Sequence, residues 1–398
     1  MLPMPPRNRP AGKAPVLRSR KESKYMLILQ FILAFGVMLF LHEFGHFIVS
    51  KAFGIEVEEF GFGLPPRLCK LFTWKGTEFT LNLLPFGAFV KPKGEFEDPS
   101  ENSLRSAPAW KQILVLLAGP GMNFLTAVVL FTICVHQVGA PEPSIVILDK
   151  VEPDSPAEIA GMLPGDQVIQ IGGTEITHYD MVSETVKQHL DEPTPIRVVR
   201  NGETLDLTVT PLSNPPEGRG AMGVIITYAV RDISLPESIK AGFEDTALMT
   251  KSYLTGLGQI ITGQVKLGME SIVGPVGMYS YFSEAAEIDE ERAEAVREHR
   301  EELEKAGVSS EIRTASNSDS GWASRLTFIG LISVCLGVTN LFPIPALDGG
   351  RILFLLPELL FKKKVPLKVE TAFNGVCMTL LLVLMAVVMF KDVFMLSR

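Results

Sequence analysis

The stretch "LFLHEFGHFIVS", residues 39–50, places two histidines and a glutamate inside a run of apolar residues. The run extends over residues 26–49, which is long enough for a helix that crosses a bilayer. Ionisable side chains at membrane depth are energetically costly and mark functional sites by default. The stretch therefore predicts a membrane-spanning helix with a site inside it.

The spacing of these polar residues indicates the chemistry of the site. His42 and His46 are four residues apart, so in a helix both imidazoles project from one face, within reach of one ion. Glu43 completes the pattern H-E-x-x-H, in which the histidines bind zinc and the glutamate is the general base. The alternative is a pair of buried, hydrogen-bonded histidines with an unrelated glutamate. The cost of three ionisable groups in an apolar span disfavours that alternative.

The composition extends the membrane interpretation to the whole chain. Of the 398 residues 46% are hydrophobic, and the mean hydropathy is +0.24. Three further apolar stretches approach the length of a membrane span, at residues 113–138, 326–346 and 371–390. The net charge of −8 argues against nucleic acid as a partner. The four cysteines form no Cys-x-x-Cys pair, which argues against a disulfide framework and a structural zinc finger.

Helix direction restricts the candidates for a third zinc ligand. The histidine pair lies near the end of the first span, and His136 lies at the far end of the second span, roughly 35 Å away at 1.5 Å per residue. The third span reaches the depth of the histidine pair near Asp348. Pro343 and Pro345 interrupt the helix there, and Gly349–Gly350 allow a further bend. The stretch "PALDGG" is also compatible with a plain Asp-Gly turn.

The region between the second and third spans contains a soluble domain. Residues 145–211, and above all "SPAEIAGMLPGDQVIQIGG" (155–173), resemble the bacterial type of PDZ domain. Asn201-Gly202 predicts a tight hairpin within it. Residues 55–95 contain short β-type runs broken by Gly and Pro. Residues 284–306 contain ten acidic and four basic residues and predict a solvated helix.

We therefore expect a polytopic α-helical membrane protein with four transmembrane helices, a membrane-associated β region and an inserted α+β PDZ domain. The expected order along the chain is a basic disordered arm (1–25), the first span (26–52), the β region (53–109), the second span (110–139), the PDZ domain (140–212), a linker with an amphipathic helix (213–283), a charged helix and linker (284–320), the third span (321–347), a loop (348–370), the fourth span (371–391) and a tail (392–398).

In combination, "HEFGH", "AGPGMNF" (118–124), the PDZ-like domain and "NLFPIPALDGGR" (340–351) resemble the site-2 protease family. The resemblance implies an intramembrane zinc metalloprotease with His42, His46 and Asp348 on Zn²⁺ and Glu43 as the catalytic base. It also implies that Asn340 contacts the substrate backbone and that residues 55–95 present the substrate as a strand. The basic arm and the charged helix are additional to the family pattern, and there is one PDZ domain where Gram-negative members typically have two.

The expected function is cleavage of the transmembrane segments of single-pass membrane proteins, such as anti-sigma factors or signal-peptide remnants. A PDZ domain near the site predicts that another, site-1 type protease trims these substrates first. The alternatives are a non-catalytic PDZ scaffold and a metal transporter, and Glu43 argues against both because neither needs a base between two ligands.

Charge predicts the orientation of the chain in the bilayer. Lys and Arg number thirteen on segments 51–111 and 348–368, against nine on the arm and tail. The positive-inside rule then puts the former segments in the cytoplasm and the PDZ domain on the extracytoplasmic side of a bacterial inner membrane. The basic arm opposes this orientation unless translation starts at Met26.

Overall fold

The computed structural model describes residues 14–94, 100–216, 219–265, 272–307, 313–314 and 321–396. Its longer helices are α1 (Ala14–Ala52), α2 (Ala109–Val138), α4 (Tyr179–Lys187), α5 (Leu235–Ile261), α6 (Pro275–Ala306), α7 (Ala323–Asn340), α8 (Asp348–Phe361) and α9 (Leu367–Leu396). The one-turn helices are η1 (Leu104–Ser106) and α3 (Pro156–Ile159).

The strands form two antiparallel sheets. The first sheet contains β1 (Val57–Trp74) and β2 (Thr77–Pro92). The second has the order β7-β6-β4-β3-β8, with β5 paired to β4. Its strands are β3 (Ala140–Val151), β4 (Gln167–Ile171), β5 (Thr174–Glu175), β6 (Thr194–Arg200), β7 (Glu203–Val209) and β8 (Val224–Arg231).

The chain divides into two compact units. The first comprises Met1–Ala127, Met249–Ser283 and Leu331–Arg398, and the second comprises Val128–Leu248 and Glu284–Gly330. Four helices in the described part of the chain are long and apolar enough to cross a membrane, within residues Tyr25–Ala52, Ala109–Val138, Ala323–Asn340 and Leu367–Phe394. The prediction of four such helices is confirmed.

Several expected boundaries were wrong. Residues 14–24 of the arm expected to be disordered are helical and belong to α1, while residues 1–13 lie outside the described residues. The expected loop over 348–370 contains α8. Glycines are tolerated in its first turn because they pack against the preceding turn, and the helix ends only at Lys362, which is left-handed.

The charged helix begins earlier than expected, since α6 runs without interruption from Pro275. The sheet of the second unit also extends past residue 212, because β8 pairs with β3. That pairing is long-range and has no hairpin signal in the sequence.

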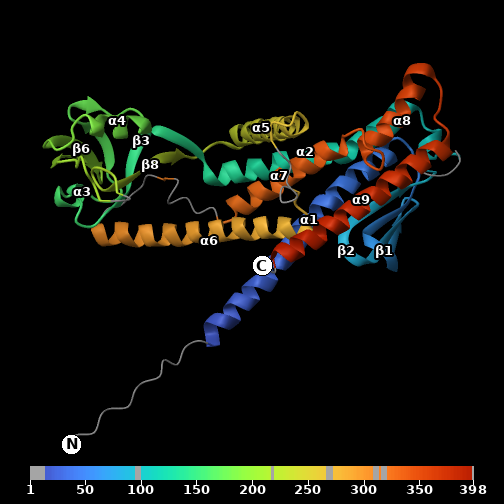
Figure 1. The fold of residues 1–398 in the computed structure, drawn as a ribbon, viewed down its shortest axis with the longest axis horizontal. Helices are drawn as coiled ribbons and strands as arrows, with labels where there is room; N and C mark the ends of the chain where they lie inside the picture. Colours follow the sequence, from blue (N-terminus) through green and yellow to red (C-terminus); the bar gives the residue numbers. More distant parts are fainter. Residues whose placement is uncertain are drawn as a thin grey trace, which may run out of the picture. The chain divides into compact units, whose positions relative to one another are not determined.

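Phenylalanines fasten the first sheet to the helix that carries His42 and His46. Phe40, Phe44 and Phe47 follow one another at helical spacing on α1 and pack against Phe60 and Phe79 of the sheet. Phe47 and Phe60 are almost completely buried. Figure 1 shows the two strands beside α1. The sheet is thus held at a fixed position relative to the histidine pair.

Each strand of the first sheet bends into two arms, so the sheet is wider than two strands. Phe60 pairs both with Phe79 on one side and with Val90 on the other. Residues 88–92 therefore form an edge, and no other strand in the described part of the chain pairs with their outer side. An unpaired edge is a template for a further strand.

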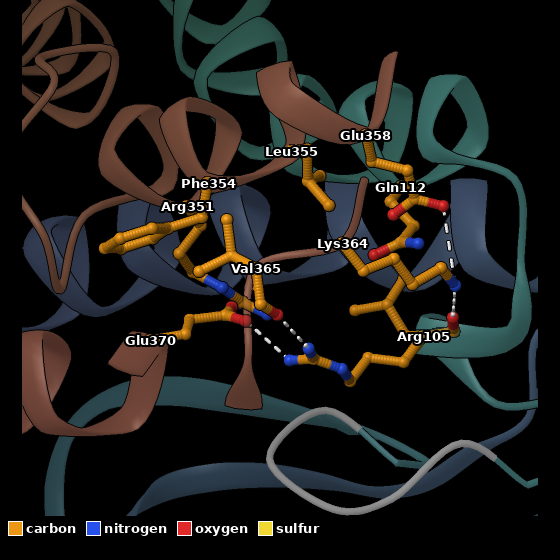
Figure 2. Close-up of a pocket in the computed structure, with 10 residues that line it drawn as sticks. Arg105, Gln112, Arg351, Phe354, Leu355, Glu358, Lys364, Val365 and Glu370 are labelled. Atoms are coloured by element: carbon orange, nitrogen blue, oxygen red, sulfur yellow. Dashed lines mark hydrogen bonds and ion pairs between the residues drawn. The ribbon is translucent and has the colours of Figure 1, made fainter. Parts of the chain in front are cut away.

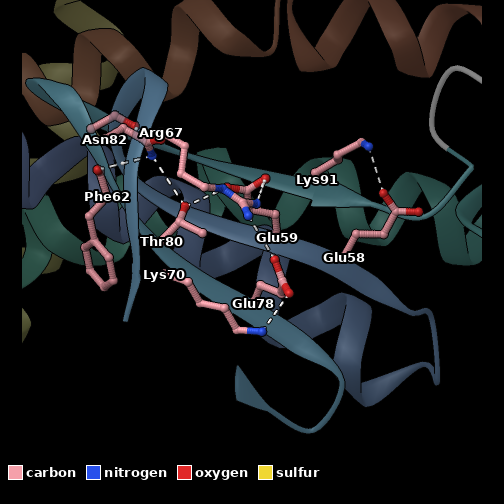
Figure 3. Close-up of polar contacts among 10 residues, drawn as sticks. Glu58, Glu59, Phe62, Arg67, Lys70, Glu78, Thr80, Asn82 and Lys91 are labelled. Atoms are coloured by element: carbon pink, nitrogen blue, oxygen red, sulfur yellow. Dashed lines mark hydrogen bonds and ion pairs between the residues drawn. The ribbon is translucent and has the colours of Figure 1, made fainter. Parts of the chain in front are cut away.

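Ion pairs connect the arms away from that edge (Figure 3). Arg67 pairs with Glu59 at 2.8 Å and with Glu78 at 3.0 Å, and Lys70 pairs with Glu78 at 2.7 Å. The hydrogen bonds from Lys70 and Arg67 hold the pKa of Glu78 below its usual range. The same sheet exposes Leu68, Phe72 and further large apolar side chains.

A polar cluster joins η1 to the connection between α8 and α9 (Figure 2). The Arg105 guanidinium pairs with Glu370 and donates to the Val365 carbonyl oxygen. The Lys364 ammonium donates to the Arg105 carbonyl oxygen and pairs with Glu358. These contacts line a small pocket and fix the end of α8 opposite to Asp348.

The second unit has its own apolar core, which includes Val146, Leu148, Ile171 and Ile196. The predicted hairpin is confirmed: Asn201 and Gly202 have φ values of 51° and 80° between β6 and β7. Helix α4 contacts β8 at its first residue, where the Tyr179 hydroxyl donates to the Ile226 carbonyl oxygen at 3.4 Å.

Candidate metal centre

Three ligand atoms converge between α1 and the start of α8. His42 Nε2 and His46 Nε2 are 3.3 Å apart, and Asp348 Oδ2 lies 3.4 Å from each of them. They form a group of donors that could hold one metal ion. Zinc bound tetrahedrally at about 2.0–2.1 Å separates neighbouring ligand atoms by about 3.3–3.4 Å. The observed triangle therefore fits zinc.

The protonation of His46 supports the same conclusion. Its Nδ1 lies 2.7 Å from the Val115 carbonyl oxygen of α2, which can only accept a hydrogen bond. The proton of the neutral ring is therefore on Nδ1, and Nε2 presents a lone pair toward Asp348. Asp348 Oδ2 is buried and makes no hydrogen bond within the described residues. Converging lone pairs repel one another unless a cation lies between them.

Glycines allow the helices to approach closely enough to build the triangle. A Cβ atom on Gly119 would lie 2.3 Å from His46 Nε2 and 2.8 Å from His42 Cε1. A Cβ atom on Gly45 would lie 2.3 Å from the Ala118 carbonyl oxygen. The crossing of α1 and α2 therefore requires both positions to lack a side chain.

The turn before α8 carries Asp348 to the histidines. Ala346 has a left-handed backbone with φ 81°, which is unfavourable for a residue other than glycine. Its N–H donates to the Asn374 Oδ1 of α9 at 3.1 Å, which holds the turn in place. Gly349 and Gly350 do not bend the chain as expected. They are helical, and a Cβ atom on either would lie within 2.2 Å of a carbonyl oxygen of the turn.

Glu43 lies beside the triangle without belonging to it. Its Oε2 accepts a hydrogen bond from the Val90 N–H at 3.2 Å, at the free edge of the first sheet. It is close enough to His42, His46 and Asp348 to interact with them electrostatically. A carboxylate at this position can take up and return a proton next to a bound metal.

The remaining predicted residue, Asn340, ends α7 before the turn that leads to Asp348 and is not one of the converging ligands. His136 contacts Ser238 at 3.0 Å, outside the group, as the sequence predicted. Sequence reasoning missed Gly119, Asn123, Val115 and Val90. The stretch "AGPGMNF" was a signal for the first two, since a glycine and an asparagine four residues apart share one face of α2.

The chain matches one family profile and is similar to several proteins along most of its length. The profile of peptidase family M50 matches residues 30–296 and 299–384. A zinc metalloprotease of Clostridium perfringens is 34% identical over 371 residues, which cover 92% of this chain and 98% of that protein. The zinc metalloprotease RasP of Geobacillus kaustophilus is 28% identical, over 92% of this chain and 97% of that protein. The regulator of sigma-W protease RasP of Bacillus subtilis is 26% identical, over 92% of this chain and 98% of that protein.

Proposed function

This chain belongs to peptidase family M50, and from that premise we propose that it is an intramembrane zinc metalloprotease that uses His42, His46, Asp348 and Glu43. The observation that carries the proposal is the triangle of ligand atoms, with sides of 3.3 and 3.4 Å, at the end of a membrane-length helix. The relatives of this chain are named as zinc metalloproteases, so the family name gives the metal as zinc and the reaction as peptide-bond hydrolysis.

Each of the four residues would have one role. His42, His46 and Asp348 would hold the ion through one atom each. Bound zinc supplies the Lewis acidity that activates water and polarises a peptide carbonyl. Glu43 takes the proton of the attacking water and passes it to the leaving amine.

The substrate must be extended at the site, because a helix hides its carbonyl groups. The outer edge of residues 88–92 supports presentation of the substrate as an added strand, since the Val90 N–H already points to Glu43. Asn340, which can donate and accept hydrogen bonds, would hold one substrate peptide group near the metal.

The substrates we propose are transmembrane segments of single-pass membrane proteins, such as anti-sigma factors or signal-peptide remnants, that a site-1 type protease has already trimmed. The name of the Bacillus subtilis relative, regulator of sigma-W protease, supports a regulatory role of this kind.

Residues 140–212 of the second unit would form a PDZ domain that restricts cleavage to trimmed substrates. The strand β8, whose outer side is bridged at Ala229 by Thr314, and the neighbouring α4 support this assignment. A strand edge beside a helix is where a peptide can add to a sheet. Deleting residues 145–211 is expected to release cleavage of untrimmed substrates if the domain is a filter, and to abolish cleavage if it is a receptor. Efficient cleavage of large, untrimmed proteins by the unmodified chain would contradict both roles.

The proposed location is a bacterial inner membrane with the PDZ domain outside the cytoplasm. The four membrane-length helices and the positive-inside count support it. A reporter that is active only in the cytoplasm, fused after residue 215, should be silent; an active reporter there would reverse the orientation.

The assignment of the metal centre is tested by metal analysis of the purified full chain. We expect one zinc per chain and cleavage of a trimmed model substrate. The His46→Ala variant should lose both. Stoichiometric zinc in His46→Ala would overturn the ligand assignment.

A further inference from the structure

Asn123 of α2 has one unpaired polar atom beside the metal centre. The side chain is fully buried, and its Nδ2 lies 3.0 Å from His42 Nδ1. Its Oδ1 is buried and has no hydrogen-bond partner among the residues that the structure describes. A buried acceptor without a partner is costly, so its immediate surroundings must be considered.

Zinc binding fixes the proton of the His42 ring. The atom of His42 in the triangle is Nε2, which must present a lone pair to a metal. In the neutral ring the proton is then on Nδ1, which becomes a donor. The amide nitrogen of Asn123 is also a donor, so in the observed orientation two donors would face each other at 3.0 Å.

A half-turn of the amide about its terminal torsion removes the contact between two donors. It exchanges Nδ2 and Oδ1, which have nearly the same shape. The amide oxygen then accepts the Nδ1–H of His42, and the amide nitrogen takes the buried position that Oδ1 has in the observed orientation. His46 already has the equivalent arrangement, because its Nδ1–H donates to the Val115 carbonyl oxygen.

We propose that Asn123 is a positioning residue for the metal centre, whose amide oxygen accepts the His42 Nδ1–H and so presents Nε2 to zinc. The inference rests on the zinc site proposed above. Helix α2 then orients both histidines, with a backbone oxygen for His46 and a side-chain oxygen for His42.

The test compares the zinc dissociation constants of full-length variants by chelator competition. Asn123→Leu removes the acceptor and should weaken zinc binding by about 10- to 100-fold, as the loss of a hydrogen-bond partner of a ligand does. Asn123→Asp keeps an acceptor oxygen and should bind zinc at least as tightly as the unmodified chain. Ser333→Ala is the matched control, because the Ser333 hydroxyl donates to the Asn123 backbone oxygen at 2.8 Å and its loss leaves the amide in place. Ser333→Ala should keep the zinc affinity of the unmodified chain.

The aspartate variant separates an accepting amide oxygen from a donating amide nitrogen. If the Asn123 amide instead donates to His42 Nδ1, Asn123→Asp should lose as much affinity as Asn123→Leu, and that result would overturn the proposal. So would an Asn123→Leu variant with unchanged affinity. If the leucine variant does not fold, the affinity of Asn123→Asp decides alone. The absorption spectrum of Co²⁺ in the site is a second readout, and it should change in Asn123→Leu but not in Asn123→Asp.

Failure here is distinct from failure of the proposed function. If the unmodified chain binds no zinc, or if His46→Ala keeps it, the zinc site itself is wrong. If the unmodified chain binds zinc and cleaves, while Asn123→Leu has the same affinity, only the role of Asn123 is refuted.

Discussion

Glu43 of α1 and Val90 of β2 are joined by a hydrogen bond of 3.2 Å from the Val90 N–H to the Glu43 carboxylate. Val90 also pairs with Phe60 across the sheet, and its N–H donates to the Glu43 carboxylate. The group expected to move the proton and the edge expected to hold the substrate are therefore in direct contact. An incoming strand would compete for this N–H and free the carboxylate.

Replacement of the base should separate binding from catalysis. Glu43→Gln keeps an oxygen that can accept from Val90 but removes the group that takes up a proton, so cleavage should fall by at least about 10²-fold. Zinc content and thermal stability should stay near those of the unmodified chain. Cleavage at the unmodified rate would exclude Glu43 as the base.

Removal of the Val90 N–H should impair presentation of the substrate. Val90→Pro deletes a donor that the sheet itself does not use. We expect slower cleavage of substrates with stable transmembrane helices, and a smaller effect on substrates that already contain helix-breaking residues. The measurement is a comparison of initial rates for the two substrate classes. Equal losses for both would indicate general damage and remove the support for an added strand.

A methyl group at the helix crossing should disturb the ligands. Gly119→Ala places a Cβ atom 2.3 Å from His46 Nε2, so the two helices must separate. Zinc affinity should therefore fall by at least about 10-fold. Gly121→Ala is the matched control on α2, because its Cβ atom would have open space around it. That variant should bind zinc normally and gain slightly in helix stability. Indistinguishable zinc affinities of the two variants would refute the steric account.

Asn340 should matter for turnover but not for the metal. Asn340→Leu removes a donor and an acceptor at the end of α7 and should lower kcat/KM severely with zinc stoichiometry and thermal stability unchanged. The alternative is a purely structural role, in which Asn340 only ends helix α7. In that case Asn340→Leu should lower the melting temperature and leave the turnover of the folded fraction unchanged.

The convergence of the three candidate ligands could be predicted from the sequence because it depends on helix geometry. Spacing of four residues puts His42 and His46 on one face in any α-helix, and the direction of the spans gives the depth of Asp348. The supporting residues depend on how helices cross. The spacing of Gly119 and Asn123 puts them on one face of α2, but it does not say that α1 passes next to that face. Helix α8 was missed because Gly349, Gly350 and Pro357 all weaken a helical pattern, and packing against the preceding turn overrides that preference.

The positions of the ligands along the chain also set a time at which the enzyme can first act. His42 and His46 enter the membrane with the first helix, whereas Asp348 follows three-quarters of the protein later. At about 5–20 residues per second, synthesis of the intervening chain takes on the order of 15–60 s. During that interval the histidines are present without their carboxylate partner. A ribosome-bound or truncated chain that stops before α8 therefore holds two of the three proposed ligands, and newly made protein is expected to be inactive until the chain from Asp348 onward has been inserted.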